Sequence, residues 1–278
     1  QEGKETGEIK KISIDNQEKV VSYVRSTNPQ EREAAYKALF EPYKHNVDKL
    51  FMIYSAIAKD WKIESKMRDY DSSISMRNFC NQIPDQVISV LLEVCTKNIG
   101  LYQEYFKIKA GMLGVDKLKR YDVYAPVTNN KEHFEFEEAQ KIVFETFEEF
   151  SPEFAKKARS VLEAKHLDSH PKENKRSGAF CMSIVPDVLP YVLTNFDHKK
   201  RDVSTLAHEL GHAVHDIYAS NHYHSVTHAP LPLCETASTF AEMIVFEKLL
   251  SQTKNHEEKK AMLMDKLADS YATIIRQN

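Results

Sequence analysis

Two histidines four residues apart, with a glutamate directly after the first, carry the clearest chemical signal in this 278-residue chain. They are His208 and His212, with Glu209 between them, in the segment TLAHELGHAVHDIYAS. In a helix this spacing puts both imidazoles on one face, where they can reach the same metal ion. Glu209 then lies about 100° round the helix and can contact a metal-bound water without being a ligand. Zn²⁺ takes neutral imidazole nitrogens readily and, in catalytic sites, keeps one position open for water.

The H-E-x-x-H pattern is typical of zinc metalloproteases, but it also occurs by chance in proteins without a metal. Two features favour the metal interpretation. The motif lies inside a predicted amphipathic helix over residues 203–219, with Asp202 as its N-cap. It also follows a predicted pair of strands, where a peptide could be held in extended form. The buried face of the helix is predicted to comprise Val203, Leu206, Ala207, Leu210, Val214 and Ile217.

A glycine inside this helix, Gly211, requires its own explanation. Glycine in a helix interior costs about 1 kcal/mol relative to alanine. We therefore expect another backbone, or the substrate, to approach the helix closely at this position.

A catalytic zinc site needs a third protein ligand. A third histidine six residues after His212 is excluded, because that residue is Tyr218. A carboxylate on the next predicted helix is the other standard solution, and it offers Glu235 and Glu242. We favour Glu235, because it lies in the first turn of that helix. Glu242 could orient a ligand histidine, although a surface or core-bridging role is the stronger interpretation.

Four more histidines lie close to the motif in sequence. His215 is one turn beyond His212 and could hydrogen-bond within the site. His222, His224 and His228 are interpreted as solvated or structural loop residues, and contact with a substrate stays open for each of them.

Composition limits the class of protein. A net charge of −3 argues against a general polyanion binder, so we expect no nucleic-acid partner. The apolar runs are too short to span a bilayer, so we expect no membrane partner. The four cysteines are scattered without C-x-x-C pairs, which is typical of free thiols in a reducing compartment and predicts a cytoplasmic protein.

The remaining pattern predicts a mainly α-helical fold with a small antiparallel sheet beside the H-E-x-x-H helix. A long helix is expected from Pro29 after an N-cap at Asn28, and another begins at Pro84. Strands are expected over residues 179–186 and 190–196. We divide the chain into a helical part, residues 1–127, and a metal-binding part, residues 128–278. A later helical block carries a predicted core stripe of Phe144, Phe147, Phe150 and Phe154.

With these residues in view, the chain resembles the oligoendopeptidase F branch of the M3 metallopeptidases, the thimet oligopeptidase family. The segment TLAHELGHAVH is followed, 23 residues after His212, by the glutamate of CETASTFAEM. Further segments resemble that branch in the same order from about residue 20 onwards: NPQEREAAYKALFEPYKHNVDKL, NQIPDQVISVLLEVCTKN, LGVDKLKRYDVYAPV, NKRSGAF and YVLTNF.

The resemblance implies zinc ligands at His208, His212 and Glu235, with Glu209 as general base. It also implies a zinc endopeptidase that cleaves short peptides. The segment SGAF matches one that pairs with substrate backbone in this family, so the expected substrate-binding residues are Gly178, Ala179 and Phe180.

Members of the family continue past the position of Asn278, into helices with a Tyr and a His near the scissile carbonyl. The resemblance therefore implies a fragment, completed by a missing C-terminal segment or by self-association, with apolar surface exposed near Phe240, Ile244 and Leu267. The alternative function is a zinc-retaining fragment with little or no turnover, acting as a binding or structural module.

Overall fold

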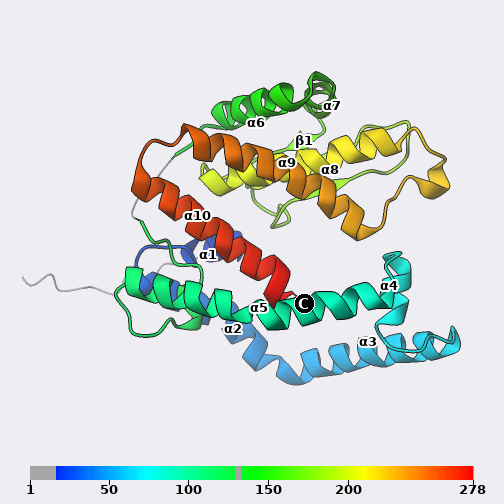
Figure 1. Cartoon of the computed structure of the whole chain (residues 1–278). Helices are drawn as coiled ribbons and strands as arrows, with labels where there is room; N and C mark the ends of the chain where they lie inside the picture. The colour runs from blue at the N-terminus through cyan, green and yellow to red at the C-terminus, as the bar shows by residue number, and fades with distance from the viewer. Residues whose placement is uncertain (1–16, 129–132, 278) are drawn as a thin grey trace, which may run out of the picture.

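The computed structural model describes residues 17–128 and 133–277, in which helices predominate around one small sheet, as predicted (Figure 1). The first part contains α1 (Gln17–Tyr23), α2 (Pro29–His45), α3 (Val47–Met67), α4 (Ser75–Cys80), α5 (Asp85–Met112) and the 3₁₀ turn η1 (Arg120–Asp122). The second contains α6 (Phe136–Phe150), α7 (Pro152–Glu163), β1 (Leu167–Asp168), β2 (Phe180–Met182), β3 (Tyr191–Leu193), α8 (Lys200–Ala219), η2 (His224–Val226), α9 (Leu231–Gln252), α10 (His256–Ser270) and the π-helical η3 (Tyr271–Arg276).

The long helix expected from Pro29 is two helices. Asn28 caps the start as predicted, because its side-chain oxygen accepts a hydrogen bond from the Gln30 amide at 2.9 Å. The helix ends at His45, and the backbone of its C-cap residue, Asn46, leaves the helical region (φ −118°, ψ 18°). Pro42 lies one turn earlier and has no N–H to donate to the preceding turn, which weakens the helix there.

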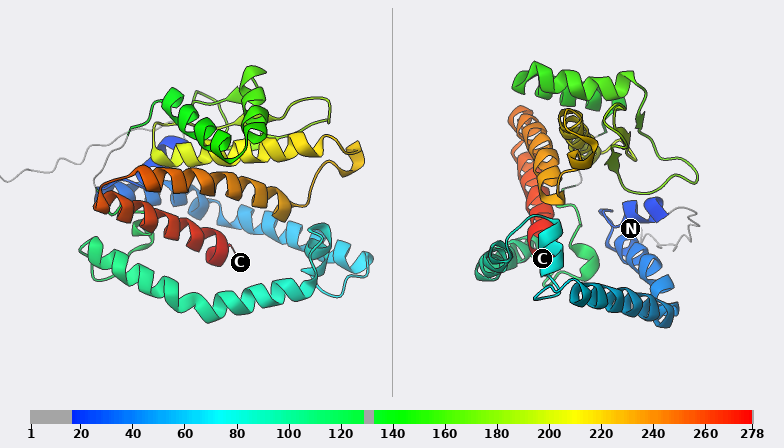
Figure 2. Two further views of the ribbon diagram at one scale, coloured as in Figure 1. Left: turned by 45° about the horizontal axis from the view of Figure 1, so that its top comes forward. Right: turned by 90° about the vertical axis from the view of Figure 1, so that its right-hand side faces the viewer.

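Helices α3, α4 and α5 form an arm on the opposite side of α10 from α6–α8 (Figure 1), and Figure 2 gives two further views of it. Helix α10 connects the arm to α9, since Tyr105 of α5 donates a hydrogen bond to the Met264 carbonyl of α10 at 3.1 Å and Lys266 of α10 donates to Glu242 of α9 at 2.6 Å. A buried ion pair, Arg32–Asp122 at 2.7 Å, joins α2 to η1. No described helix combines the length and the apolar composition needed to cross a membrane.

The sheet has three strands in the order β1-β3-β2. Strands β2 and β3 pair antiparallel, with Cys181 opposite Val192, as the sequence predicts. Strand β1 adds a parallel edge, with Leu167 opposite Val192, so the sheet is mixed rather than purely antiparallel. Two residues are too few to show a strand pattern, and β1 is recognised only by its pairing with β3.

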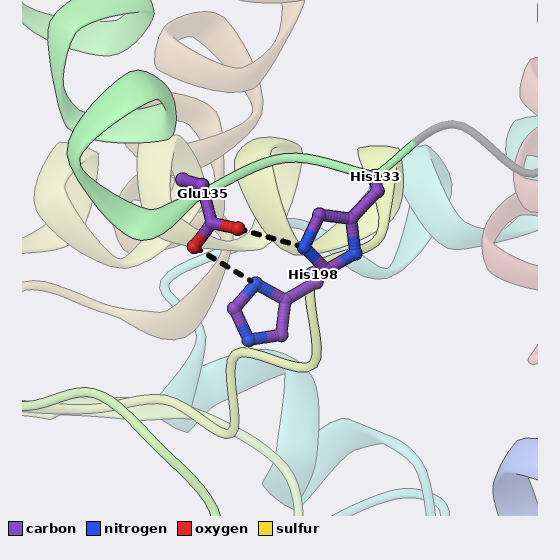
Figure 3. A group of neighbouring side chains, drawn as sticks. All are labelled: His133, Glu135 and His198. Atoms are coloured by element: carbon purple, nitrogen blue, oxygen red, sulfur yellow. Dashed lines mark hydrogen bonds and ion pairs between the residues drawn. The ribbon is translucent and has the colours of Figure 1, made fainter.

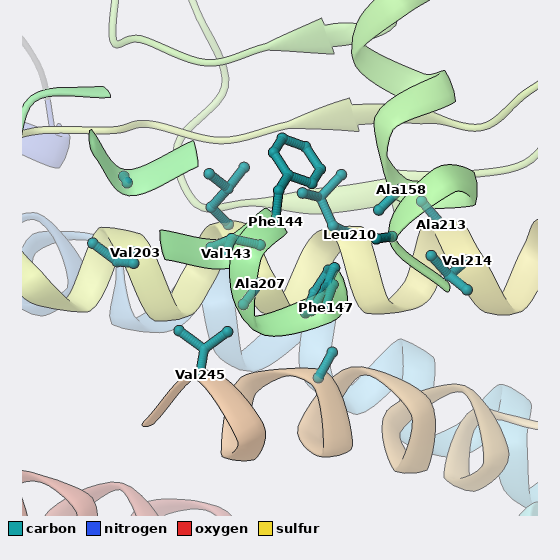
Figure 4. Close-up of a cluster of buried hydrophobic side chains, with 14 of the residues drawn as sticks. Val143, Phe144, Phe147, Ala158, Val203, Ala207, Leu210, Ala213, Val214 and Val245 are labelled. Atoms are coloured by element: carbon teal, nitrogen blue, oxygen red, sulfur yellow. The ribbon is translucent and has the colours of Figure 1, made fainter. Parts of the chain in front are cut away.

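The main core surrounds α8, which lies between α6, α7 and the sheet on one side and α9 on the other (Figure 4). The residues predicted to form the buried face of α8 are buried, except that Ile217 is only partly buried. In the phenylalanine stripe, Phe144 and Phe147 are buried but Phe150 is 54% exposed. That correction follows from the position of Phe150 at the last residue of α6, where its ring meets Phe240 of α9 edge-on instead of entering the core.

Helix α8 begins at Lys200, three residues earlier than predicted, and Asp202 is its third residue rather than its N-cap. The Asp202 carboxylate reaches back to accept hydrogen bonds from the amides of Asp197 and Lys199, at 2.8 Å and 3.0 Å. A carboxylate in this position satisfies amides that precede the helix and extends it towards the N-terminus.

A cluster of His133, Glu135 and His198 joins the start of α8 to the loop before α6 (Figure 3). The Phe134 amide donates to the His198 carbonyl and His198 Nδ1 donates to the Phe134 carbonyl, both at 3.0 Å. The imidazoles of His133 and His198 stack at a 12° interplanar angle, with Glu135 bonded to His133 Nε2 at 2.9 Å. His198 Nδ1, the nitrogen that faces Glu135, already donates a hydrogen bond to a carbonyl. We therefore interpret the cluster as a structural link that fixes where α8 begins.

Candidate metal centre

Helix α8 presents His208 and His212 one turn apart on the face that meets α9. Their ring centroids are 4.9 Å apart and their planes cross at 84°. The two side chains are 25% and 17% exposed, so each imidazole is held by packing while one edge stays accessible. The geometry follows from the four-residue spacing alone, because it needs only a regular helix.

Helix α9 adds Glu235, which is its fifth residue and so lies just past the first turn where it was predicted, because the helix begins at Leu231. Glu235 Oε2 lies 3.4 Å from His208 Nε2 and 3.7 Å from His212 Nε2. One ligand atom of each residue falls within 4.8 Å of the other two. Ser238, one turn later, donates a hydrogen bond to Glu235 Oε2 at 3.1 Å and holds the carboxylate in place. Two imidazoles and one carboxylate are the donor set of a catalytic zinc site.

Gly211 explains how α9 comes close enough to α8. A Cβ atom at position 211 would lie 2.6 Å from Ala241 Cβ, 3.0 Å from Ser238 Cα and 3.1 Å from the Ala237 carbonyl oxygen. The close approach expected from the sequence is therefore that of the α9 backbone. The cost of a helical glycine is offset by a helix crossing that brings Glu235 to the two histidines.

We expect Gly211→Ala to destabilise the protein and to weaken metal binding. The added methyl group forces α8 and α9 apart, and overpacking of this kind costs about 1–3 kcal/mol. The measurements are urea unfolding and zinc affinity by chelator competition. Gly100→Ala is the matched control, because Gly100 lies within α5 with nothing inside 4 Å of its added Cβ. Equal effects of the two substitutions would contradict the steric account.

Glu209 is buried beside the histidines, with 6% of its surface exposed. Its Oε2 atom has no hydrogen-bond partner among the described residues. Burial raises the pKa of Glu209 to about 7; the positive charge of His208 opposes this shift and the negative charge of Glu235 adds to it. An unpaired buried acceptor with a pKa near neutrality is suited to take a proton from a water and release it again.

The other candidate carboxylate, Glu242, lies on the opposite edge of the His208 ring. Its Oε2 lies 3.4 Å from His208 Nδ1, and Lys266 of α10 donates to its Oε1 at 2.6 Å. Burial opposes ionisation of Glu242, but the hydrogen bonds from His208 and Lys266 outweigh it and lower its pKa. A carboxylate held at Nδ1 fixes the tautomer of His208 and leaves Nε2 free to bind a metal.

We expect Glu242→Gln to lower zinc affinity by roughly 10- to 100-fold while the fold is kept, because it removes the charge that orients His208. Lys266→Met should also lower the zinc affinity, since the lysine holds the carboxylate of Glu242 in place. Zinc competition with a chromophoric chelator measures both effects. Glu247→Gln, an exposed glutamate on the same helix, is the control. Unchanged affinity in Glu242→Gln would show that the glutamate does not position the histidine.

The predicted substrate-binding residues lie at the start of the edge strand β2. Gly178 has a φ of +81°, a conformation that favours glycine, and its carbonyl accepts a hydrogen bond from Asn195 Nδ2 at 2.7 Å. Ala179 and Phe180 are half-buried. Asn195 also binds the Arg176 carbonyl at 3.0 Å and so shapes this turn. Neither Asn195 nor Lys266 carries a sequence signal, because the partners of both are distant in the chain.

The remaining histidines stay outside the His208–His212–Glu235 group. His215 is half-buried, one turn beyond His212, and its charge opposes the rise in the pKa of Asp216 that burial causes. His222, His224 and His228 are exposed in the loop between α8 and α9.

Comparison with known proteins gives a consistent assignment. An oligoendopeptidase F homolog of Lactococcus lactis subsp. lactis (strain IL1403) is 30% identical over 258 residues, covering 92% of this chain and 43% of the relative. A crystal structure from Chlamydophila abortus superposes with a TM-score of 0.74 at 29% identity, covering 94% of this chain and 44% of that one. An oligoendopeptidase-F from Enterococcus faecium shares the fold, with a TM-score of 0.63 at 23% identity, over 98% of this chain and 41% of that one.

The chain therefore spans less than half the length of the curated relatives that it matches. The match to the family nevertheless extends over almost the whole chain, since the sequence model of peptidase family M3 matches residues 22–277. On this evidence the chain belongs to peptidase family M3.

Proposed function

We propose that this chain carries the zinc centre of an endopeptidase that hydrolyses short peptides. The observation that supports the proposal most strongly is the convergence of His208 Nε2, His212 Nε2 and Glu235 Oε2 beside the unpaired carboxylate of Glu209. The donor set fits zinc, and Glu209 would offer an unpaired acceptor to a water bound there. Zinc, when bound, supplies a Lewis acid that polarises a carbonyl and acidifies water.

Each residue of the proposed site has a separate role in the reaction. His208, His212 and Glu235 hold the metal, and Glu242 keeps His208 in the tautomer that binds through Nε2. Glu209 accepts the proton of the attacking water at its carboxylate and passes it to the leaving amine. The free edge of β2, beginning at Phe180, offers backbone groups that could hold a peptide in extended form.

A second candidate is a zinc-retaining module with little turnover. The share of the relatives that this chain spans, 43% for the Lactococcus lactis protein, favours it, because groups outside the matched region could be required for the reaction. Under both candidate functions the chain binds zinc, but only under the first does it cleave peptides at an appreciable rate.

Metal analysis combined with peptide cleavage tests the proposal. We expect one zinc ion per chain after dialysis against metal-free buffer, and zinc-dependent cleavage of a short quenched peptide that stops on chelation and returns with zinc. A chain that takes up no zinc at neutral pH would overturn both candidates. A fully loaded chain without measurable cleavage would favour the zinc-retaining module.

A further inference from the structure

Helix α5 exposes a regular row of apolar side chains. Val87, Val94, Leu101 and Ile108 are spaced seven residues apart, and they are 51%, 50%, 70% and 51% exposed. Val90 lies on the same flank and is 50% exposed. Residues seven apart share one side of a helix, and a repeat of this length is the pattern along which a second helix packs. We call these five residues the α5 row.

Helix α3 exposes apolar side chains on every side. Phe51, Met52, Ile53 and Tyr54 are consecutive and are 69%, 71%, 57% and 73% exposed. Four consecutive residues point around the whole circumference of a helix. A helix that is apolar all round is normally surrounded by other protein. One flat contact cannot cover α3, whereas several helices packed around it can.

The total exposed surface of the chain is also larger than that of a folded monomer of the same mass. The chain exposes 19255 Å² at a mass of 32.1 kDa. A folded monomer of this mass exposes about 12,000 Å². Apolar side chains exposed side by side along α3 and α5 mark a site of protein–protein contact.

The relatives indicate what covers it. This chain spans 43% of the Lactococcus lactis protein and 44% of the Chlamydophila abortus chain, so both have polypeptide with no counterpart in these 278 residues. The last described turn, η3, lies against the middle of α5, where Cys95 Sγ donates to the Ile274 carbonyl at 3.7 Å (Figure 1). This end of the chain is thus adjacent to the exposed arm.

We propose that the α3–α5 arm docks a helical polypeptide equivalent to the part of the M3 relatives that this chain does not span. One amphipathic helix of that partner lies along the α5 row, and others surround α3. A second copy of this chain is the competing occupant, but a two-fold contact through the α5 row leaves the other sides of α3 uncovered. The proposal concerns docking alone and does not depend on zinc or turnover.

The test uses this chain and, as probe, the flanking parts of the Lactococcus lactis relative produced separately. We expect a one-to-one complex by light scattering, with slowed hydrogen exchange along α3 and α5. Leu101→Lys should weaken binding at least ~10-fold, because a central apolar contact is replaced by a charge. Gln103→Lys, an exposed position on the same helix away from the row, is the matched control and should bind like the unchanged chain.

Three results would overturn the proposal: no complex, equal binding by the Leu101→Lys and Gln103→Lys variants, or a homodimer of this chain that Leu101→Lys dissociates. The last result would identify a second copy as the occupant. Zinc content is measured in parallel and should be the same in both variants. Loss of docking with zinc retained would therefore contradict only this inference, and loss of zinc in the unchanged chain only the proposed function.

Discussion

Replacing Glu209 with glutamine is expected to abolish most peptide cleavage while zinc stays bound. The amide keeps the shape of the side chain but cannot accept the proton of the attacking water. General bases typically contribute about 10²- to 10⁴-fold to the rate, and we expect a loss of that size. Glu209 Oε2 makes no hydrogen bond to the described residues, so the substitution removes no structural contact there.

The measurement is kcat on a quenched short peptide, in a polypeptide that joins residues 1–278 to the flanking parts of the Lactococcus lactis relative. Zinc content by atomic emission and unfolding by urea serve as controls, and both should match the unchanged protein. A Glu209→Gln variant that cleaves at the normal rate would assign the base to another group. Loss of zinc in that variant would indicate that Glu209 is a ligand.

His208→Ala is expected to abolish both zinc binding and cleavage. The substitution removes the Nε2 atom that lies 3.4 Å from Glu235, and two ligands remain where a catalytic zinc site needs three. It also leaves Glu242 without its imidazole partner. We expect zinc affinity to fall by more than the ~10- to 100-fold that loss of an orienting residue causes.

Zinc competition at neutral pH measures the effect, and His222→Ala is the matched control because His222 is exposed in the loop after α8. That control should bind zinc like the unchanged chain. If His208→Ala retained zinc with normal affinity, the metal would have to bind elsewhere, and the His133–Glu135–His198 cluster would be the first place to look. If His208→Ala and Glu209→Gln lost zinc equally, their proposed roles would not be separate.

The crossing of α8 and α9 connects these predictions to the fold. Gly211 lets the α9 backbone approach, and the same contact that buries Ala241 brings Glu235 within 4 Å of both histidines. Lys266 then extends the network to α10, through Glu242. In the proposed zinc centre, metal affinity is therefore expected to depend on the packing of three helices and to respond to substitutions at their contacts as well as to loss of a ligand.

Features that depend on neighbours along the chain could be predicted from the amino-acid sequence. His208, Glu209 and His212 share a helix, so their relative directions follow from its 3.6-residue period. The Asn28 cap and the antiparallel pairing of β2 with β3 were predictable for the same reason, because a cap acts within one turn and a short connection brings adjacent strands together. The glycine in the motif also indicated a close approach to the helix, by another backbone or by the substrate.

Features that join distant segments depend instead on how the helices and strands pack together. Glu235 and Glu242 both lie on α9, and the rotation and crossing of α9 against α8 set which one meets Nε2 and which meets Nδ1 of His208. Lys266, Asn195 and β1 have roles that no local pattern shows, since each depends on a partner supplied by another element. Spacing along a helix fixes directions within that helix, but contacts between elements are chosen by how whole surfaces pack, which is a property of the complete core rather than of any short stretch.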